Sequence, residues 1–224
     1  ALPPEQLSLH NKPQTHLLDF RPVLHCKPAV GYILAYTVHN FELFAFRSWI
    51  VAYLGFAVTL HPGESLLITA SAIAAISTLV GLPASLLGNE LARLIGRHKA
   101  ITLIMWTSSA VATGLGLMAE APLWALTLMT IIYGVLLTGD SSSITAGTVA
   151  EAPSGYKGAT LAVHSCIGFL GSFLGPLVFG LVLDVASPTS IGGITASSWS
   201  WAFSISAIVA ATGPVILYLL RARG

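Results

Sequence analysis

Residues 88–99 read G-N-E-L-A-R-L-I-G-R-H-K and form the densest cluster of charge in the sequence. Apolar runs flank this cluster on both sides, at residues 66–87 and 100–119. Each run is apolar all round and about 20 residues long, which is the length that a helix needs to cross the hydrocarbon core of a membrane. The stretch therefore predicts two membrane-spanning helices joined by a short basic turn, and its Lys and Arg residues favour the cytoplasmic side.

The composition agrees with an integral membrane protein. Hydrophobic residues make up 54% of the 224 residues and charged residues 8%, whereas soluble domains carry about 25% charged residues. The net charge of +1 argues against a nucleic acid partner, because such partners attract a basic surface. The sequence has no His, Cys and Glu spacing typical of a metal site and no glycine-rich nucleotide loop. We therefore expect no metal, no cofactor and no enzyme activity.

The same apolar pattern continues over the rest of the chain. Residues 1–28 are polar and broken by prolines, and we interpret them as a cytoplasmic linker. Residues 29–224 are expected to form an all-α bundle of six transmembrane helices in the lipid bilayer. The predicted spans cover residues 31–60, 66–87, 100–119, 123–150, 160–183 and 198–220.

Cations are distributed unevenly around these spans. Of the ten Lys and Arg residues, Arg47 lies within the first span and none lies in an outer loop. The other nine fall in segments that this threading places inside, namely Lys12, Arg21, Lys27, Arg93, Arg97, Lys99, Lys157, Arg221 and Arg223. Because Lys and Arg are enriched on the cytoplasmic side, we expect a multi-pass protein of the cytoplasmic (inner) membrane with both ends in the cytoplasm.

The basic stretch resembles a motif of the major facilitator superfamily of transporters. The superfamily's loop pattern G-x-L-A-D-R-x-G-R-K, matched from its first glycine, falls on residues 89–98. The positions that agree with it are Leu91, Ala92, Gly96 and Arg97, whereas the glycine, the aspartate and the following arginine are replaced by Asn89, Arg93 and Leu94. In the fifth predicted span, a Gly-x-x-x-Gly-Pro feature of the superfamily resembles the run that holds Gly171, Gly175 and Pro176.

On these features, residues 15–224 resemble the C-terminal six-helix half of such a transporter. The resemblance implies twelve spans in all, with an N-terminal six-helix half that is not in this sequence. It also implies secondary active transport of a small solute by alternating access.

The first predicted span carries a polar stripe. At 100° per residue, Tyr36, His39, Asn40 and Arg47 fall within about 100° of one another, and Glu42 lies about 60° beyond His39. A charge at the bilayer centre costs at least about 2.5–3.5 kcal/mol, so this stripe must face protein or water. We interpret it as a substrate and proton pathway. A structural ion pair between Glu42 and Arg47 is the alternative. Arg47 favours an anionic substrate, because a desolvated guanidinium binds carboxylates well.

The fourth predicted span carries a second polar face, which contains Tyr133, Asp140 and Ser143. At about 1.5 Å per residue, Glu42 and Asp140 both lie near the middle of the membrane, and we expect them to face a common cavity. Intramembrane acids often mark proton sites. We choose Asp140 as the carboxyl that carries the proton, because Arg47 shares the helix of Glu42. Asp140 as a cap or a bridge to a neighbouring helix is the alternative.

Small residues form a seam along the fifth predicted span, at Gly168, Gly171 and Gly175. Small residues at this spacing let two helices approach closely, so the sequence favours a packing seam, with a kink at Pro176. His164 continues the same seam and could alternatively relay protons.

Two other classes of membrane protein fit the sequence less well than a transporter does. A channel or a non-transporting scaffold, formed by a homo-oligomer of six-helix units, is the main alternative. Acids and an arginine on two different helices fit alternating access better than a ring of like residues does. An intramembrane protease of the rhomboid type is disfavoured, because residues 139–143 lack the Gly-x-Ser-Gly helix start that such enzymes need.

Overall fold

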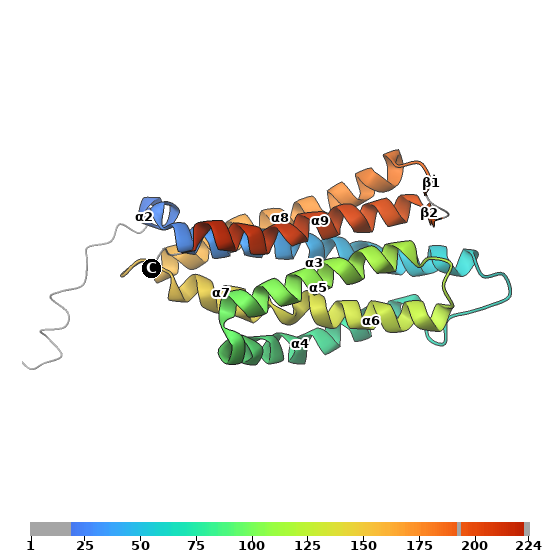
Figure 1. Ribbon diagram of the computed structural model, residues 1–224, viewed down its shortest axis with the longest axis horizontal. Coiled ribbons are helices and arrows are strands. Elements are labelled where there is room, and N and C mark those ends of the chain that lie inside the picture. The colour runs from blue at the N-terminus through green and yellow to red at the C-terminus, as the bar shows by residue number, and fades with distance from the viewer. Residues whose placement is uncertain (1–18, 192–193, 222–224) are drawn as a thin grey trace, which may run out of the picture.

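The computed structural model describes residues 19–191 and 194–221, so most of the predicted linker and Arg223 lie outside it. Six helical segments are long and apolar enough to cross a membrane. They are α3 (Lys27–Thr59), α4 (Ala70–Ile95), α5 (Arg97–Leu117), α6 (Leu123–Gly139) continued by α7 (Ser141–Ala150), α8 (Lys157–Val185) and α9 (Ser198–Leu220). The predicted six-helix bundle of a multi-pass membrane protein is confirmed (Figure 1).

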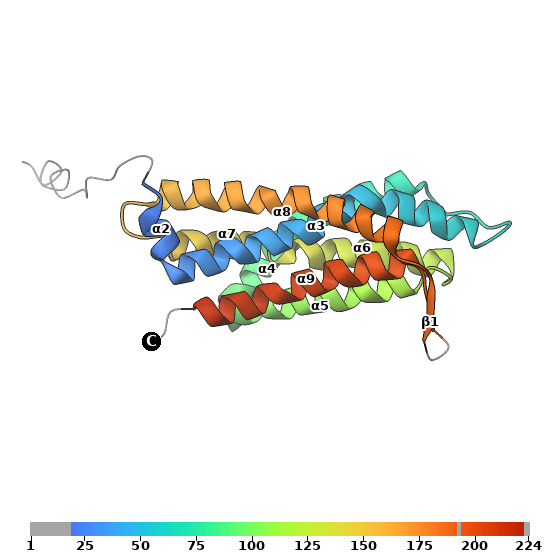
Figure 2. The same ribbon diagram turned by 90° about the horizontal axis from the view of Figure 1, so that it is seen from above.

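Helix α3 is the centre of the bundle. It packs against α7, α8 and α9, while α5 packs on α9 and α4 packs on α6 (Figures 1 and 2). The largest buried hydrophobic cluster contains several aromatic side chains. Phe46 contacts Tyr133 edge-on at 4.8 Å between ring centroids, and Phe179 contacts Phe203 at 5.1 Å, in the geometry that aromatic pairs prefer. Because other helices pack around α3, its polar residues His39, Asn40 and Glu42 are held inside the protein rather than in lipid.

Both ends of the described chain lie at one end of the bundle. A short helix, α2 (Arg21–His25), precedes α3 and buries Val23 against Ile33 and Val163. Figure 1 shows α2 and the C-terminus at the same end. An even number of crossings requires this arrangement.

The predicted turn at residues 88–99 is largely helical in the structure. Helix α4 begins at Ala70, capped by Thr69, and continues to Ile95. The chain reverses at Gly96 alone, whose φ of 92° suits glycine, and α5 begins at Arg97. Leu91 and Ala92 therefore belong to the last turns of α4. The predicted turn is wrong over residues 88–95, which continue α4. Solvated charges are compatible with a helix, and Glu90 pairs with Arg93 at 3.0 Å on its exposed surface.

The fourth predicted span is interrupted once, at Asp140, which separates α6 from α7. Ser85 of α4 contacts this interruption. The Ser85 hydroxyl accepts a hydrogen bond from the backbone N–H of Ser142 at 3.3 Å. It also donates a hydrogen bond to the Ser142 hydroxyl at 3.0 Å. Ser143 adds a hydrogen bond from its hydroxyl to the Gly88 carbonyl at 3.2 Å. The Ser85 hydroxyl thus supplies the Ser142 N–H with an acceptor that a continuous helix would supply itself, and Ser143 ties α7 to α4.

The glycines of the fifth predicted span lie against α3. A Cβ on Gly171 would lie 3.0 Å from the Thr37 carbonyl carbon and overlap its oxygen, and one on Gly175 would lie 2.9 Å from the Phe41 carbonyl carbon. Pro176 is within α8, and its carbonyl accepts a hydrogen bond from the Trp49 indole at 3.0 Å. The absence of side chains at these positions therefore lets α8 approach the α3 backbone closely.

A small hairpin between α8 and α9 was not predicted. Strands β1 (Thr189–Ile191) and β2 (Ile194–Ala196) pair antiparallel, with Thr189 opposite Ala196. The α9 helix then starts in a capping box between Ser197 and Ser200.

Candidate functional site

The polar residues of α3 divide into two groups with different surroundings. We call Tyr36, His39, Asn40, Glu42 and Arg47 the α3 polar row. His39, Asn40 and Glu42 are at most 3% exposed, whereas Arg47 is exposed on the side of the bundle that faces α4. The row therefore supplies an interior cluster and a separate surface cation.

His39 pairs with Asp140 inside the bundle. Its Nδ1 lies 2.9 Å from the Asp140 Oδ1, and the two side chains are 2% and 3% exposed. By helical rise, both residues lie about 5–6 Å from the midpoints of their spans. The interruption between α6 and α7 places the Asp140 side chain against α3. Of the predicted polar face of the fourth span, Asp140 and Tyr133 both contact α3, while Ser143 contacts α4.

A stack of rings connects His39 with α8. The Tyr36 ring lies 5.8 Å from the His39 ring and 3.9 Å from the His164 ring, tilted by 17° and 19°. Nδ1 of His164 lies 3.1 Å from the Thr148 hydroxyl. Gly168 makes room for the stack, because a Cβ there would overlap the Tyr36 ring. The glycine seam thus also positions the polar row.

Glu42 has its own set of partners. Its Oε1 accepts hydrogen bonds from the Ser108 hydroxyl of α5 at 2.7 Å and from the Tyr133 hydroxyl of α6 at 2.9 Å. Buried polar groups need such partners, since an unsatisfied one costs about 1–3 kcal/mol. Among the described residues no ion pair joins Glu42 to Arg47. The Arg47 guanidinium lies instead 5.8 Å from the centroid of the Phe44 ring.

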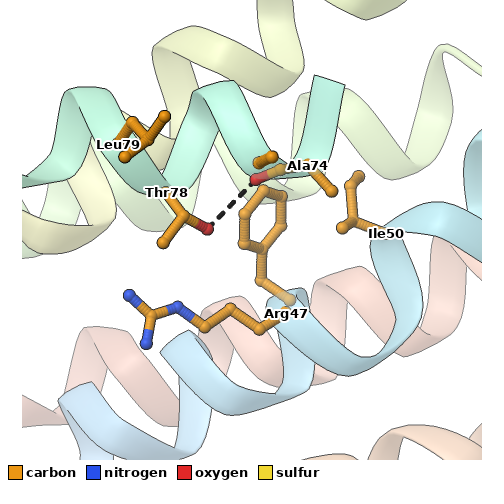
Figure 3. Close-up of a pocket in the computed structure, with 7 residues that line it drawn as sticks. Arg47, Ile50, Ala74, Thr78 and Leu79 are labelled. Atoms are coloured by element: carbon orange, nitrogen blue, oxygen red, sulfur yellow. Dashed lines mark hydrogen bonds between the residues drawn. The ribbon is translucent and has the colours of Figure 1, made fainter. Parts of the chain in front are cut away.

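Arg47 lies between two neighbouring pockets on the α4 side of α3. One, of about 470 Å³, is lined by Arg47, Ile50 and residues of α4, and Figure 3 shows the arginine side chain extending along α3 beneath Thr78 and Leu79. The other, of about 370 Å³, we call the α3–α4 pocket. It is lined by Tyr36, Asn40, Leu43, Phe44, Arg47, Thr78, Leu79, Gly81, Leu82, Ser85, Thr138, Ser141 and Phe169.

We expected Glu42 and Asp140 to face a common cavity, and neither of the two pockets around Arg47 is such a cavity. Neither acid lines the two pockets around Arg47, and both face the packed interior. The pocket-lining members of the polar row are Tyr36, Asn40 and Arg47. Tyr36 and Asn40 belong to both environments, because both line the α3–α4 pocket while Tyr36 stacks on His39 and Asn40 is buried beside it.

Sequence reasoning missed Ser85, Ser108 and Ser142. Ser108 lies in the short run Thr107-Ser108-Ser109 of α5, which does not indicate which of the three side chains meets a neighbouring helix. Ser85, by contrast, belongs to a run of small residues on one face of α4, with Ser77, Gly81 and Gly88, and this spacing indicates close packing. The loop-motif residues Leu91, Ala92, Gly96 and Arg97 lie at the α4–α5 junction, where the Tyr32 hydroxyl is 3.5 Å from Nδ1 of His98.

Comparison with protein-family models finds no match to this chain, and comparison with curated proteins finds none either. Across residues 19–191 and 194–221, no three His, Cys, Asp or Glu side chains gather in a group that could hold a metal ion. The α3 polar row and its partners are therefore the candidate functional site.

Proposed function

We propose that this chain is the C-terminal six-helix half of a major facilitator superfamily transporter, which moves a small solute across the cytoplasmic membrane by alternating access, coupled to proton movement. The observation that carries the proposal is the buried contact between His39 and Asp140 at 2.9 Å near the middle of the span. Ionisable groups inside a membrane are expensive and mark ion or proton pathways in transporters.

The pair can carry one proton per cycle. With a neutral imidazole and an ionised carboxylate, the pair bears one negative charge. Uptake of a proton on the ring makes it neutral overall, and release restores the first state. Nε2 of His39 is buried without a hydrogen-bond partner, so it is the ring atom at which a proton can arrive. Because the pair is sealed from both sides, exchange requires the bundle to open toward one side at a time.

The position of Arg47 supports a second half of the transporter. Arg47 is exposed in this bundle, about 6 Å from the midpoint of α3, and a cation there cannot face lipid without a penalty of at least about 2.5–3.5 kcal/mol. An N-terminal six-helix bundle across a water-filled cavity would cover it. A homo-oligomeric channel is supported less well, because His39 and Asp140 are paired within one bundle rather than repeated around an axis.

The function is tested by proton flux that depends on solute. The protein as the cell makes it is reconstituted into vesicles that contain a pH-sensitive dye, and a panel of small metabolites is applied without a pH gradient. We expect at least one solute to drive a pH change that a protonophore abolishes. Solute uptake with no pH change across the panel would contradict proton coupling, and permeation of ions without saturation would favour a channel.

The proposed orientation has a separate test. With Cys26 and Cys166 replaced by serine, single cysteines are placed at Glu64, Glu120 and Lys99, which are all exposed. The distribution of Lys and Arg predicts that Glu64→Cys and Glu120→Cys react with an impermeant maleimide added to intact cells. Lys99→Cys should react only after the cells are opened. Labelling of Lys99→Cys in intact cells would reverse the orientation.

A further inference from the structure

The α3–α4 pocket has a polar wall with few groups that are free to donate to a ligand. Three of its five hydroxyls already donate elsewhere. Thr78 donates to the Ala74 carbonyl at 3.0 Å, Thr138 donates to the Gly134 carbonyl at 2.8 Å, and Ser85 donates to Ser142. The Tyr36 and Ser141 hydroxyls remain, together with two nitrogen donors that line the pocket, the Asn40 amide and the Arg47 guanidinium.

Both nitrogen donors lack a hydrogen-bond partner in the described part of the chain. Nδ2 of Asn40 is buried and makes no hydrogen bond, although the residue is only 3% exposed. No carboxylate lies within ion-pair distance of Arg47 in the part of the chain that the structure describes. A buried amide without a partner is unfavourable, and an acceptor on a ligand in this pocket would satisfy both groups.

Apolar side chains form much of the pocket wall. Leu43, Leu79 and Leu82 line it together with the rings of Phe44 and Phe169. The volume of about 370 Å³ is at the small end of the range for ligand sites. An inorganic anion would leave this wall uncovered, and a neutral hydrocarbon would leave Arg47 and Asn40 unsatisfied.

We propose that the α3–α4 pocket binds a small organic monocarboxylate with an apolar body, and that this is the solute class of the transporter. This inference rests on the proposed function. The carboxylate accepts hydrogen bonds from Arg47 and Asn40, and the body lies on the leucines and Phe169. A guanidinium and a carboxylate form a charge-assisted, two-pronged contact. Tyr36 then connects the occupied pocket to His39, because its ring touches both.

Binding is tested with radiolabelled benzoate and the purified protein in nanodiscs of neutral phospholipid. We expect saturable binding that Arg47→Gln weakens by about tenfold or more, since one such contact is a charge-assisted hydrogen bond. Arg47→Lys should retain part of the affinity, because it keeps the charge but not the fork. Arg93→Gln is the matched control, since Arg93 pairs with Glu90 on an exposed surface, and it should leave binding unchanged.

Competition by related compounds tests the carboxylate and the apolar body of the proposed ligand separately. Cyclohexanecarboxylate should displace benzoate, whereas benzamide and acetate should not compete at similar concentrations. Competition by benzamide, or unchanged binding in Arg47→Gln, would overturn the site. Loss of benzoate binding when phosphatidylglycerol is added to the nanodiscs would assign the pocket to a lipid phosphate and overturn it too.

The transport assay distinguishes this inference from the proposed function. Benzoate that binds at Arg47 but is not moved by a pH gradient would contradict the transporter and leave the site intact. Proton-coupled transport of another solute, with no effect of Arg47→Gln on it, would overturn the monocarboxylate site and leave the transporter intact.

Discussion

Asp140→Asn is expected to abolish accumulation driven by a pH gradient and to preserve exchange of solute across the membrane. The amide has nearly the shape of the carboxyl group but cannot gain or lose a proton. His39 therefore loses the charge that stabilises its protonated form at 2.9 Å. We expect uphill accumulation in vesicles to fall to the level of empty vesicles, while counterflow of labelled against unlabelled solute continues.

Glu42→Gln is the matched control for this variant. It removes the ionisable group of another buried acid of the bundle, and its amide oxygen can still accept from Ser108 and Tyr133. Accumulation should survive in Glu42→Gln. If Asp140→Asn accumulates solute normally and Glu42→Gln does not, the proton carrier is Glu42 and the proposed role of Asp140 is wrong.

The fold follows from the sequence wherever it depends on length and apolarity alone. Six apolar runs predict six spanning helices, because in lipid a helix satisfies all the backbone hydrogen bonds of such a run within the run itself. The ends of the spans were less predictable. Helix α4 runs to Ile95 through Glu90 and Arg93, since a helix that extends into water tolerates charge there. What stops it is Gly96, a single residue with positive φ.

The candidate site was predictable in its helix faces but not in its pairings. The helical period places His39, Asn40 and Arg47 on one side of α3. Periodicity alone does not identify the residue of a neighbouring helix that each of them contacts. His39 and Asp140 are 101 positions apart, so their contact depends on how α3 packs against α6 and α7. The division between buried acids and an exposed Arg47 likewise follows from tertiary packing. Close packing along α4 did have a sequence pattern, the small residues that include Gly81 and Gly88.

That packing predicts a second large effect, at Gly88. A Cβ on Gly88 would lie 2.7 Å from the Gly139 carbonyl carbon and overlap the carbonyl oxygen. These are backbone atoms next to the interruption at Asp140, and they cannot rotate away as a side chain could. Gly88→Ala must therefore push α4 from α6, which also strains the hydrogen bond from Ser143 to the Gly88 carbonyl at 3.2 Å.

We expect Gly88→Ala to lower the free energy of unfolding by about 1–3 kcal/mol or more, the usual range for overpacking. Thermal unfolding of the purified protein in detergent, followed by intrinsic tryptophan fluorescence, measures this change. Gly114→Ala is the control, because a Cβ on Gly114 in α5 meets nothing within 4 Å, and alanine is the better helix former there. Gly114→Ala should match or exceed the stability of the unmodified protein. Equal stability of the two variants would mean that α4 does not pack against the α6 backbone at Gly139, and the serine contacts around Asp140 would lose their structural basis.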